Sequence, residues 1–316
     1  MVAIDPRYRS TYADASWTPY WLDRDARPPA RPALEGEHTV DLAIVGAGFT
    51  GLWAALQALE DLPGREVMVL EGERVAFGAS GRNGGFCEAS LTHGLDNGLQ
   101  RFPTEIERIE QEGRENLQGI ARAIERYGID CAWEPTGTLV VATEPHQVQW
   151  CRDAVPHLGA YGHEVAFLDR EAVRGEVDSP RYIGGFWRKD GGACIDPARL
   201  AWGLAAAAQG LGARIHEHST VTAIDDDGDA LIVRTARGRV RARRVILGTN
   251  AYPPLAKKIQ RYILPVYDYV LMTEPLGAER KAAIGWANRQ GLADMTNQFH
   301  YYRLTADDRI LWGGYD

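Results

Sequence analysis

Three glycines near the start of the chain have the spacing of a turn that binds a pyrophosphate. The apolar run at residues 40–45 predicts a buried parallel strand. Gly46, Gly48 and Gly51 follow it in the pattern Gly-x-Gly-x-x-Gly, directly before a helix predicted over residues 52–62. The first glycine permits a tight turn, the second lets phosphates approach the backbone, and the third lets helix and strand pack closely. Free amides at the positive helix end would then face the phosphates.

One carboxylate stands where a dinucleotide would place its ribose. Glu71 follows the second predicted strand, residues 66–70, and lies twenty residues after Gly51. A carboxylate there accepts hydrogen bonds from both ribose hydroxyls and disfavours a 2′-phosphate. The order of these features along the chain, a strand, the glycines, a helix and then the acid, favours a dinucleotide site over a glycine-rich turn without a ligand. They do not separate NAD from FAD.

A second glycine-rich loop, residues 78–85, comes shortly after this acid. Its sequence, Gly-Ala-Ser-Gly-Arg-Asn-Gly-Gly, interleaves hydroxyl, guanidinium and amide groups with glycine. Such a loop can run along an extended dinucleotide, with its amides and Arg82 near the phosphates or a flavin ring. A plain surface loop is one alternative. An NAD-dependent dehydrogenase is another, but it would leave residues 81–85 without an obvious task.

The remaining periodicity predicts helices and extended segments. Apolar residues mostly three or four apart over residues 104–127 indicate a helix with a charged outer face that ends at Gly128. Asp196 and Pro197 suit the N-cap and first position of a helix that stops near Gly210. Extended segments are predicted at residues 137–143, 181–188, 214–216, 220–224, 231–235 and 240–247.

Charge and cysteine content exclude several kinds of partner and site. The 316 residues include 35 Lys and Arg against 43 Asp and Glu, a net charge of −8, so binding to nucleic acid or an anionic membrane is not expected. The four cysteines lie far apart and include no Cys-x-x-Cys pair, which argues against a zinc knuckle, an iron–sulfur cluster and the disulfide framework of a secreted protein. The first residues do not resemble a signal peptide, and no apolar run reaches about 18 residues. We therefore expect a soluble, cytoplasmic protein with reduced thiols.

Three polar clusters are interpreted as structural. His216, Glu217 and His218 could offer metal ligands, but alternation on a half-exposed strand explains them better. The acidic run at residues 225–229 lacks the final Glu of a calcium loop and predicts a hairpin turn. The arginines within residues 239–244 are expected on a solvated strand face.

Together, the two glycine loops and Glu71 resemble the start of the FAD-dependent glycine/D-amino-acid oxidase (DAO) family. Three later segments resemble the same family, residues 195–200, 220–224 and 245–252. Residues 301–309, ahead of Gly313 and Gly314, are most similar to the gamma-glutamylputrescine oxidoreductases within that family. The similarity extends over nearly the whole chain from Val40 onward.

The resemblance implies an α/β fold in which a Rossmann-like FAD-binding domain is interleaved with a substrate domain built on a mixed β-sheet. An irregular N-terminal arm is expected over residues 1–38, with Trp17, Tyr20 and Trp21 packed on the body. The FAD-binding domain is expected at residues 39–90 and 195–255, and the substrate domain at residues 91–194 and 256–316.

FAD is the implied cofactor, held by both glycine loops and by two later segments. The residues expected to bind it are Gly46, Gly48, Thr50, Gly51, Glu71, Ser80, Arg82, Asn83, Gly84, Gly85, Val221, Gly248 and Thr249. Val221 would meet the adenine through its backbone. Tyr302 and Arg303 are candidates for holding a substrate carboxylate, with a core or edge tyrosine and a solvated arginine as the alternative.

The implied activity is oxidation of the C–N bond of a small amine or amino acid by hydride transfer to flavin, followed by hydrolysis of an imine. Candidate substrates are gamma-glutamylputrescine-like or sarcosine-like compounds and D-amino acids. This chemistry requires no conspicuous nucleophile or base, so no catalytic residue is assigned. Members of the family continue well past a strand such as the one with Gly313 and Gly314. We therefore expect a truncated member, and a nucleotide-binding remnant without turnover is the second hypothesis.

Overall fold

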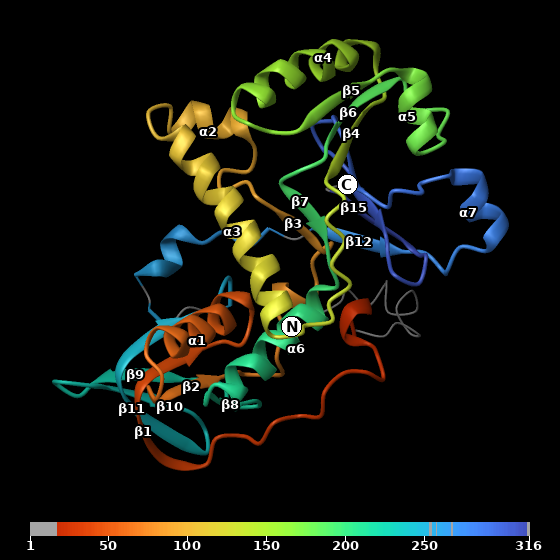
Figure 1. Cartoon of the computed structure of the whole chain (residues 1–316). Helices are drawn as coiled ribbons and strands as arrows, with labels where there is room; N and C mark the ends of the chain where they lie inside the picture. The colour runs from red at the N-terminus through yellow and green to blue at the C-terminus, as the bar shows by residue number, and fades with distance from the viewer. Residues whose placement is uncertain (1–17, 253–254, 257, 267, 315–316) are drawn as a thin grey trace, which may run out of the picture.

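Two β-sheets form the framework of the chain, one of six strands and one of seven (Figure 1). The computed structural model describes residues 18–252, 255–256, 258–266 and 268–314. In Figure 1 the six-stranded sheet lies at the lower left and most of the seven-stranded sheet at the upper right. The long helix α3 (Ile106–Arg126) runs between them.

The six-stranded sheet has the order β8-β2-β1-β11-β10-β9. Its strands are β1 (Gly36–Val45), β2 (Val67–Leu70), β8 (Arg214–His216), β9 (Ala223–Asp226), β10 (Leu231–Arg234) and β11 (Gly238–Leu247). The first four in this order pair in parallel, and β9 and β10 form an antiparallel hairpin. The end of β1 is buried from Leu42 to Val45, as a central parallel strand covered on both faces requires.

Two helices, α1 (Phe49–Asp61) and α6 (Pro197–Gly210), pack on each other and on one face of this sheet. α6 begins as the sequence predicts, because the Asp196 carboxylate accepts a hydrogen bond from the Arg199 amide at 3.1 Å. Even-numbered residues of the end of β1 face the helices, and alternate residues face a second apolar cluster behind the sheet. The glycine-rich connection after β1 is therefore held between two packed layers.

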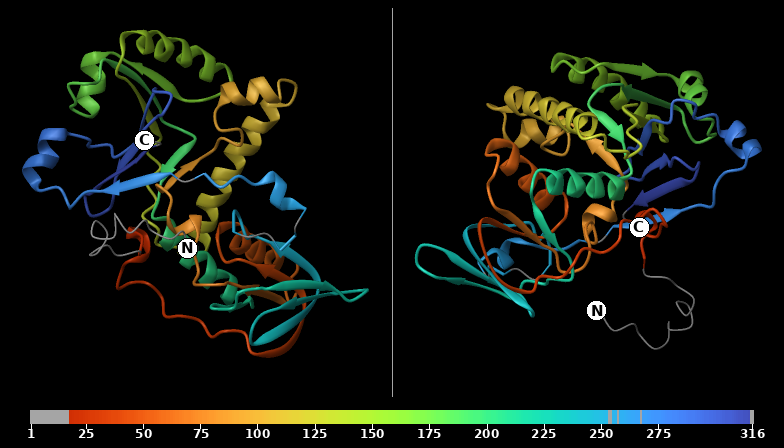
Figure 2. Two further views of the ribbon diagram at one scale, coloured as in Figure 1. Left: turned by 180° about the vertical axis from the view of Figure 1, so that it is seen from behind. Right: turned by 60° about the horizontal axis from the view of Figure 1, so that its bottom comes forward.

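The seven-stranded sheet has the order β12-β15-β14-β13-β4-β6-β5. Its strands are β4 (Thr138–Ala142), β5 (Val165–Leu168), β6 (Gly184–Arg188), β12 (Tyr269–Met272), β13 (Gly291–Asp294), β14 (Tyr301–Leu304) and β15 (Ile310–Gly314). β13 and β4 are parallel and the other pairs are antiparallel, so the sheet is mixed. Helices α4 (Pro145–Ala160) and α5 (Arg170–Glu176) pack on β6 and β5, as the view from behind in Figure 2 also shows.

Short elements connect the two sheets. β3 (Phe86–Glu88) pairs with β7 (Gly192–Cys194) in a two-stranded sheet. The remaining elements are α2 (Leu95–Arg101), α7 (Ala278–Ile284) and the 3-10 turns η2 (Tyr20–Leu22), η3 (Ala79–Gly81) and η4 (Ile259–Tyr262). The second glycine loop thus leads from η3 directly into β3, between the two large sheets.

The predicted α/β fold with a Rossmann-like βαβ start and a mixed sheet is confirmed. Several boundaries differ from the prediction. β1 begins at Gly36, inside the predicted arm, because its first residues pair with β11. The strand predicted at residues 220–224 begins only at Ala223. The division into an arm and two interleaved domains stays a prediction.

The segment before β1 is fastened to both sheets. In the second view of Figure 2 it runs along the six-stranded sheet toward β1. Trp21 is 5% exposed, and its indole N–H donates to the Asn83 carbonyl at 2.8 Å. The Tyr20 hydroxyl donates to Asp307 at 2.7 Å, beside the seven-stranded sheet. Packing of these two aromatic residues agrees with the sequence-based expectation, and Trp17 lies outside the described residues.

The His216–Glu217–His218 cluster corrects one prediction. Glu217 is buried, at 1% exposure, and is no half-exposed strand residue. Its carboxylate accepts from the amides of Arg31 at 2.6 Å and Val75 at 2.7 Å, and the guanidinium groups of Arg31 and Arg74 lie within 3.7 Å. Sequence alternation could not reveal this burial, because the covering segment comes from the distant N-terminal region.

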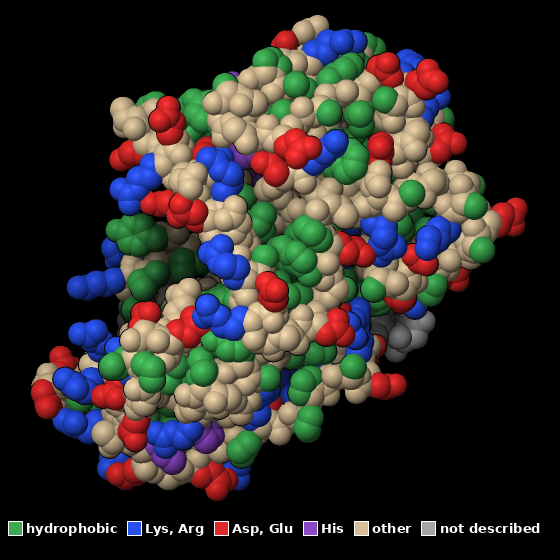
Figure 3. Space-filling view, viewed as in Figure 1, with side chains coloured by type: hydrophobic (Ala, Val, Ile, Leu, Met, Phe, Trp, Pro, Cys, Tyr) green, Lys and Arg blue, Asp and Glu red, His purple; other side chains and the backbone are tan. Residues whose placement is uncertain are grey.

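The surface carries mixed charge. Figure 3 shows Lys and Arg side chains interspersed with Asp and Glu over the face seen in Figure 1. On β11, Arg239 pairs with Glu37 at 2.7 Å and Arg241 with Asp227 at 3.1 Å, so the predicted solvated strand face is confirmed. The predicted turn between β9 and β10 is confirmed too. No helix among the described residues combines the length and apolar character needed to cross a bilayer.

The Glu217 cluster leads to a first prediction. Glu217→Gln keeps the side-chain volume but removes the charge that faces Arg31 and Arg74. We expect the free energy of unfolding in chemical denaturation to fall by roughly 1–3 kcal/mol, because two partly buried cations lose their counter-charge. Glu115→Gln, on the exposed face of α3, is the matched control and should change the free energy of unfolding by less than about 0.5 kcal/mol. Equal effects of the two substitutions would contradict the prediction.

Candidate cofactor site

The first glycine turn is a point where three backbone segments touch. Gly46 has φ +102°, and a Cβ on it would lie 2.6 Å from the carbonyl oxygen of Gly248. A Cβ on Gly51 would lie 1.9 Å from the carbonyl oxygen of Gly46. The Gly248 amide donates to the Val45 carbonyl at 2.8 Å, which extends the β1–β11 pairing up to the turn. Only glycine fits at positions 46 and 51. The backbone therefore carries no side chain at these two positions, where β1 ends and α1 begins.

The N-terminus of α1 keeps backbone donors available. Gly48 occupies the N-cap position and supplies no side-chain cap. The Phe49 amide donates to the Ser80 hydroxyl oxygen at 2.9 Å, which brings the second glycine loop to this helix end. Among the described residues, the amides of Thr50 and Gly51 have no acceptor. Such amides, at the positive end of a helix, suit a bound anion.

Glu71 lies directly beside this turn. Its Oε2 accepts from the Ala47 amide at 2.7 Å, and its Oε1 accepts from the Glu73 amide at 3.0 Å. Burial raises the pKa of the Glu71 carboxyl above its ordinary value, these two amides lower it, and the nearby charges of Glu217 and Glu73 raise it. Each carboxylate oxygen keeps lone pairs, so the group can accept further hydrogen bonds from hydroxyl donors.

The second glycine loop is rigidly held. The Asn83 side chain donates to the Ala79 carbonyl at 3.0 Å and accepts from the Gly85 amide at 2.9 Å. Gly84 is buried, and a Cβ there would lie 2.6 Å from the ring of Tyr301. Arg82 is exposed and folds back on its own loop, where its Nε donates to the Phe77 carbonyl at 2.7 Å. Its predicted contact with phosphates stays a prediction.

The two later segments differ in how closely they approach the turn. Gly248 lies against Gly46 and Gly51, and Thr249 follows it at the end of β11. Val221 comes two residues after Ser219, whose amide donates to the Glu71 carbonyl at 2.8 Å. The Val221 side chain belongs to the apolar cluster behind the six-stranded sheet, so its backbone is what remains for a ligand.

The two predicted substrate residues, Tyr302 and Arg303, do not share a site. They are neighbours on β14 and therefore point to opposite faces of the sheet. The Tyr302 hydroxyl lies 2.6 Å from that of Tyr182, and its ring stacks on Trp312 with centroids 4.3 Å apart. Arg303 extends toward the second glycine loop. Neither side chain is more than 4% exposed, so their contact with a substrate stays a prediction.

Sequence reasoning expected Trp21 to pack on the body and Ser80 to bind the cofactor. It did not predict that the Trp21 indole donates to the Asn83 carbonyl or that the Ser80 hydroxyl accepts from the first amide of α1. It also gave Tyr301 no role of its own. Tyr301 lies between Gly84 and Gly313, and a Cβ on either glycine would collide with its ring. The glycines at positions 84 and 313 were the available signal, because glycine in a strand or before one often marks the close approach of another group.

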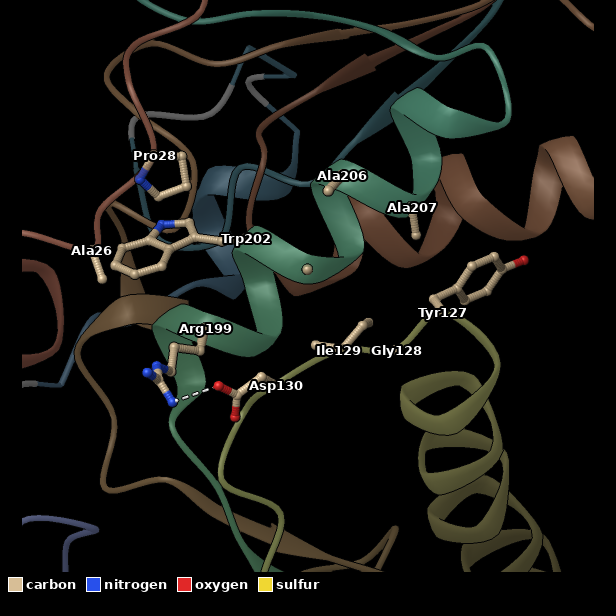
Figure 4. A pocket seen from close by; sticks show the side chains of 11 residues that line it. Ala26, Pro28, Tyr127, Gly128, Ile129, Asp130, Arg199, Trp202, Ala206 and Ala207 are labelled. Carbon is tan, nitrogen blue, oxygen red and sulfur yellow. Dashed lines mark hydrogen bonds and ion pairs between the residues drawn. The ribbon is translucent and has the colours of Figure 1, made fainter.

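The described part of the chain also has a separate groove of about 500 Å³, away from the glycine loops. It lies between α6 and the end of α3, and Figure 4 shows Trp202 and Pro28 facing each other across one end. Arg199 and Asp130 form an ion pair at 3.2 Å on its rim. The groove contains neither glycine turn nor Glu71, so we do not assign it to the cofactor.

None of the four thiols is activated. Burial raises the pKa of Cys131 to about 12 and those of Cys87, Cys151 and Cys194 to about 11, so all four stay protonated at neutral pH. Within the described residues, no group of three His, Cys, Asp or Glu side chains is placed to hold a metal ion. The groups of the site that can bind a ligand are therefore the backbone amides at the start of α1 and the Glu71 carboxylate.

The sequence that forms this Rossmann-like turn, the acid beside it and the mixed second sheet matches the model of a known protein family. The chain belongs to the DAO family of FAD-dependent oxidoreductases, whose pattern it matches over residues 41–316. The cofactor and the class predicted from the sequence are thereby confirmed at the level of the family. The cradle of Gly46, Gly48 and Gly51, with its available amides and Glu71, fits an FAD pyrophosphate and ribose.

Gamma-glutamylputrescine oxidoreductase of Escherichia coli K12 is 37% identical over 286 residues, which are 87% of this chain and 64% of that protein. A probable oxidoreductase of Haemophilus influenzae, OrdL, is 32% identical over 302 residues, which are 93% of this chain and 69% of that protein. The predicted resemblance to gamma-glutamylputrescine oxidoreductases is therefore confirmed. The chain spans only 64% of the length of the first of these relatives.

Solved structures agree on the fold. Glycine oxidase from Geobacillus kaustophilus superposes with a TM-score of 0.69 at 20% identity, covering 88% of this chain and 71% of that one. L-proline dehydrogenase from P. horikoshii gives a TM-score of 0.67 at 17% identity, covering 90% and 71%. At these identities the likeness establishes the shared fold.

The crowding at the first turn leads to a second prediction. Gly51→Ala places a methyl group against the Gly46 carbonyl, so the turn must open. We expect a loss of about 1–3 kcal/mol in the free energy of unfolding and weaker FAD binding in a fluorescence titration. Gly210→Ala, at the end of α6 where a Cβ meets nothing within 4 Å, is the control and should preserve both. An unaltered Gly51→Ala protein would refute the crowding argument.

The Glu71 environment leads to a third prediction, on pH. Because the folded protein holds this proton more tightly than the unfolded chain, the contribution of Glu71 to stability without FAD is lost as pH rises from about 4.5 through the raised pKa. Ribose hydroxyls would stabilise the ionised form. We therefore expect FAD affinity to weaken as pH falls from 8 toward 5.

Fluorescence titrations of FAD at successive pH values measure this dependence. Glu71→Gln should bind FAD more weakly at pH 8 and should lose most of the change with pH. Glu66→Gln, an exposed carboxylate before β2, is the control and should keep the wild-type profile. A pH profile of Glu71→Gln identical to that of the wild type would assign the titration to another group.

Proposed function

We propose that this chain oxidises the C–N bond of a small amine or amino acid with FAD as the hydride acceptor. The observation that carries the proposal is the glycine cradle at the start of α1 with Glu71 beside it. When bound, FAD accepts a hydride from the carbon next to the amine nitrogen, and water hydrolyses the resulting imine.

In this proposal the chain contributes binding and orientation. The amides of Thr50 and Gly51 would hold the pyrophosphate, and Glu71 would accept hydrogen bonds from the ribose hydroxyls. The remaining predicted contacts would come from the second loop, Val221 and the Gly248–Thr249 segment. The second loop lies between the six-stranded and seven-stranded sheets, so a flavin along it would face the side of β14 that carries Tyr301.

We propose gamma-glutamylated polyamines as the first substrates to test. The support is the 37% identity to a protein named for gamma-glutamylputrescine. Sarcosine and D-amino acids follow as the other substrate classes that the family resemblance implies. Nucleotide binding without turnover is the competing hypothesis.

The fourth prediction tests this proposal directly. The purified protein should be yellow with flavin absorbance, or should become so when FAD is added. Anaerobic addition of gamma-glutamylputrescine, putrescine, sarcosine or a D-amino acid should bleach the flavin bands, with the preferred substrate bleaching them fastest. Colourless protein that takes up no FAD would refute the cofactor site. Bound flavin that none of these compounds bleaches would favour nucleotide binding without turnover.

A further inference from the structure

Arg303 is the largest charged side chain that the described part of the fold encloses almost completely. It lies on β14 and is 1% exposed. Burial of a guanidinium ion is costly unless its donors and its charge are satisfied. The groups that satisfy it therefore indicate what the residue does.

Three backbone carbonyls and one carboxylate surround this guanidinium. Its Nη1 donates to the carbonyls of Gly85 at 2.9 Å and Ile195 at 2.7 Å, and its Nε donates to the Leu304 carbonyl at 3.1 Å. Its Nη2 lies 3.7 Å from Oε2 of Glu134. That oxygen is buried and has no hydrogen-bond partner among the described residues, so the charge of Arg303 compensates it.

The contact with Gly85 fixes the end of the second glycine loop. Gly85 has φ +74°, and a Cβ there would lie 2.8 Å from Nη1 of Arg303 and 2.3 Å from the Ile195 carbonyl oxygen. The Gly85 carbonyl also accepts from the Ile195 amide at 2.8 Å. Loop, strand β14 and the entry to α6 thus meet at one carbonyl, with no room for a side chain.

Glu134 extends the network back to the seven-stranded sheet. Its Oε1 accepts from Nε of Arg289 at 2.8 Å, and Arg289 in turn pairs with Asp308 at 3.0 Å. Asp308 lies in the turn between β14 and β15. Arg303 on β14 and the turn that follows this strand are therefore both linked to the Glu134 carboxylate, which resists a shift of Arg303 relative to the sheet.

We propose that Arg303 is a positioning residue that sets the second glycine loop against the seven-stranded sheet, and that it acts on FAD through the Gly84–Gly85 backbone instead of binding a substrate carboxylate. This inference rests on the proposed function, because it takes that backbone to border the flavin. Nε and Nη1 of Arg303 already donate to carbonyls on three segments, and its Nη2 faces the Glu134 carboxylate. A substrate carboxylate could reach this guanidinium only by displacing one of these groups.

The fifth prediction compares Arg303→Lys and Arg303→Met with the wild type. Lysine keeps the charge. Unlike the planar guanidinium, however, its single ammonium group cannot bond the Gly85 and Ile195 carbonyls and face Glu134 at the same time. We expect the FAD dissociation constant to rise about tenfold or more in Arg303→Met and less in Arg303→Lys, with a shifted absorption spectrum of the bound flavin. Arg243→Met, which removes a 79% exposed arginine on β11, is the control.

Substrate kinetics separate the two roles of Arg303. A positioning role predicts equal losses in kcat/KM for amines with and without a carboxylate. Unchanged FAD affinity and flavin spectrum, with a raised KM confined to carboxylated substrates, would overturn the proposal. A lower melting temperature with both flavin readouts unchanged would overturn it as well, because the residue would then be merely structural.

Glu134→Gln is the second variant, and it keeps the proposal testable if both Arg303 variants fail to fold. It removes the counter-charge but retains a side chain of the same size, so we expect the same flavin shifts in smaller measure. Unshifted flavin in this variant would count against the proposal. Failure of the wild type to bind FAD would instead refute the proposed function, so the two failures are distinguishable.

Discussion

The architecture depends on the close contact of backbone segments at the end of β1. Pairing of Val45 with Leu247 brings Gly248 to the point where α1 starts, and Gly46 and Gly51 leave no space for side chains there. The contact aligns the helix end with the carboxyl end of two parallel strands, which is where open α/β sheets bind ligands. The amides of Thr50 and Gly51 stay available as donors because Gly48, at the N-cap position, has no side chain that could cap them.

Carboxylates then organise the loops around this contact. Glu71 takes one amide from the first turn and one from the segment that follows β2, and Glu217 takes the amides of Arg31 and Val75. The nearby charge of Glu217 raises the pKa of the Glu71 carboxyl. Arg31 brings a cation to Glu217 from the segment before β1. That segment is consequently linked to the residues that follow β8, although its sequence has no regular pattern.

Local sequence was sufficient for features that depend on neighbours in the chain. The glycine turn and the Asp196 cap follow from spacing of a few residues, and the position of Glu71 follows from its place directly after the second strand of the βαβ unit. It was insufficient where the partner is distant. Burial of Glu217 requires the N-terminal segment, and burial of Arg303 requires Gly85 and Ile195, so an alternating or charged pattern alone predicts exposure for both. The resemblance to a family supplied the identity of the cofactor, which glycine spacing alone left open between NAD and FAD.

The alternation along β14 explains how one strand serves two different surroundings. Tyr302 and Leu304 belong to the apolar cluster within the seven-stranded sheet, where the Tyr302 hydroxyl is paired with that of Tyr182. Tyr301 and Arg303 face the second glycine loop, one against Gly84 and the other bonded to Gly85. A shift of one residue in the pairing of β14 with β15 would exchange these faces, placing a guanidinium in the apolar cluster and an aromatic ring against the Gly85 carbonyl. The buried charge and the apolar residues therefore both favour this register, and the same register places Tyr301 and Arg303 against the loop.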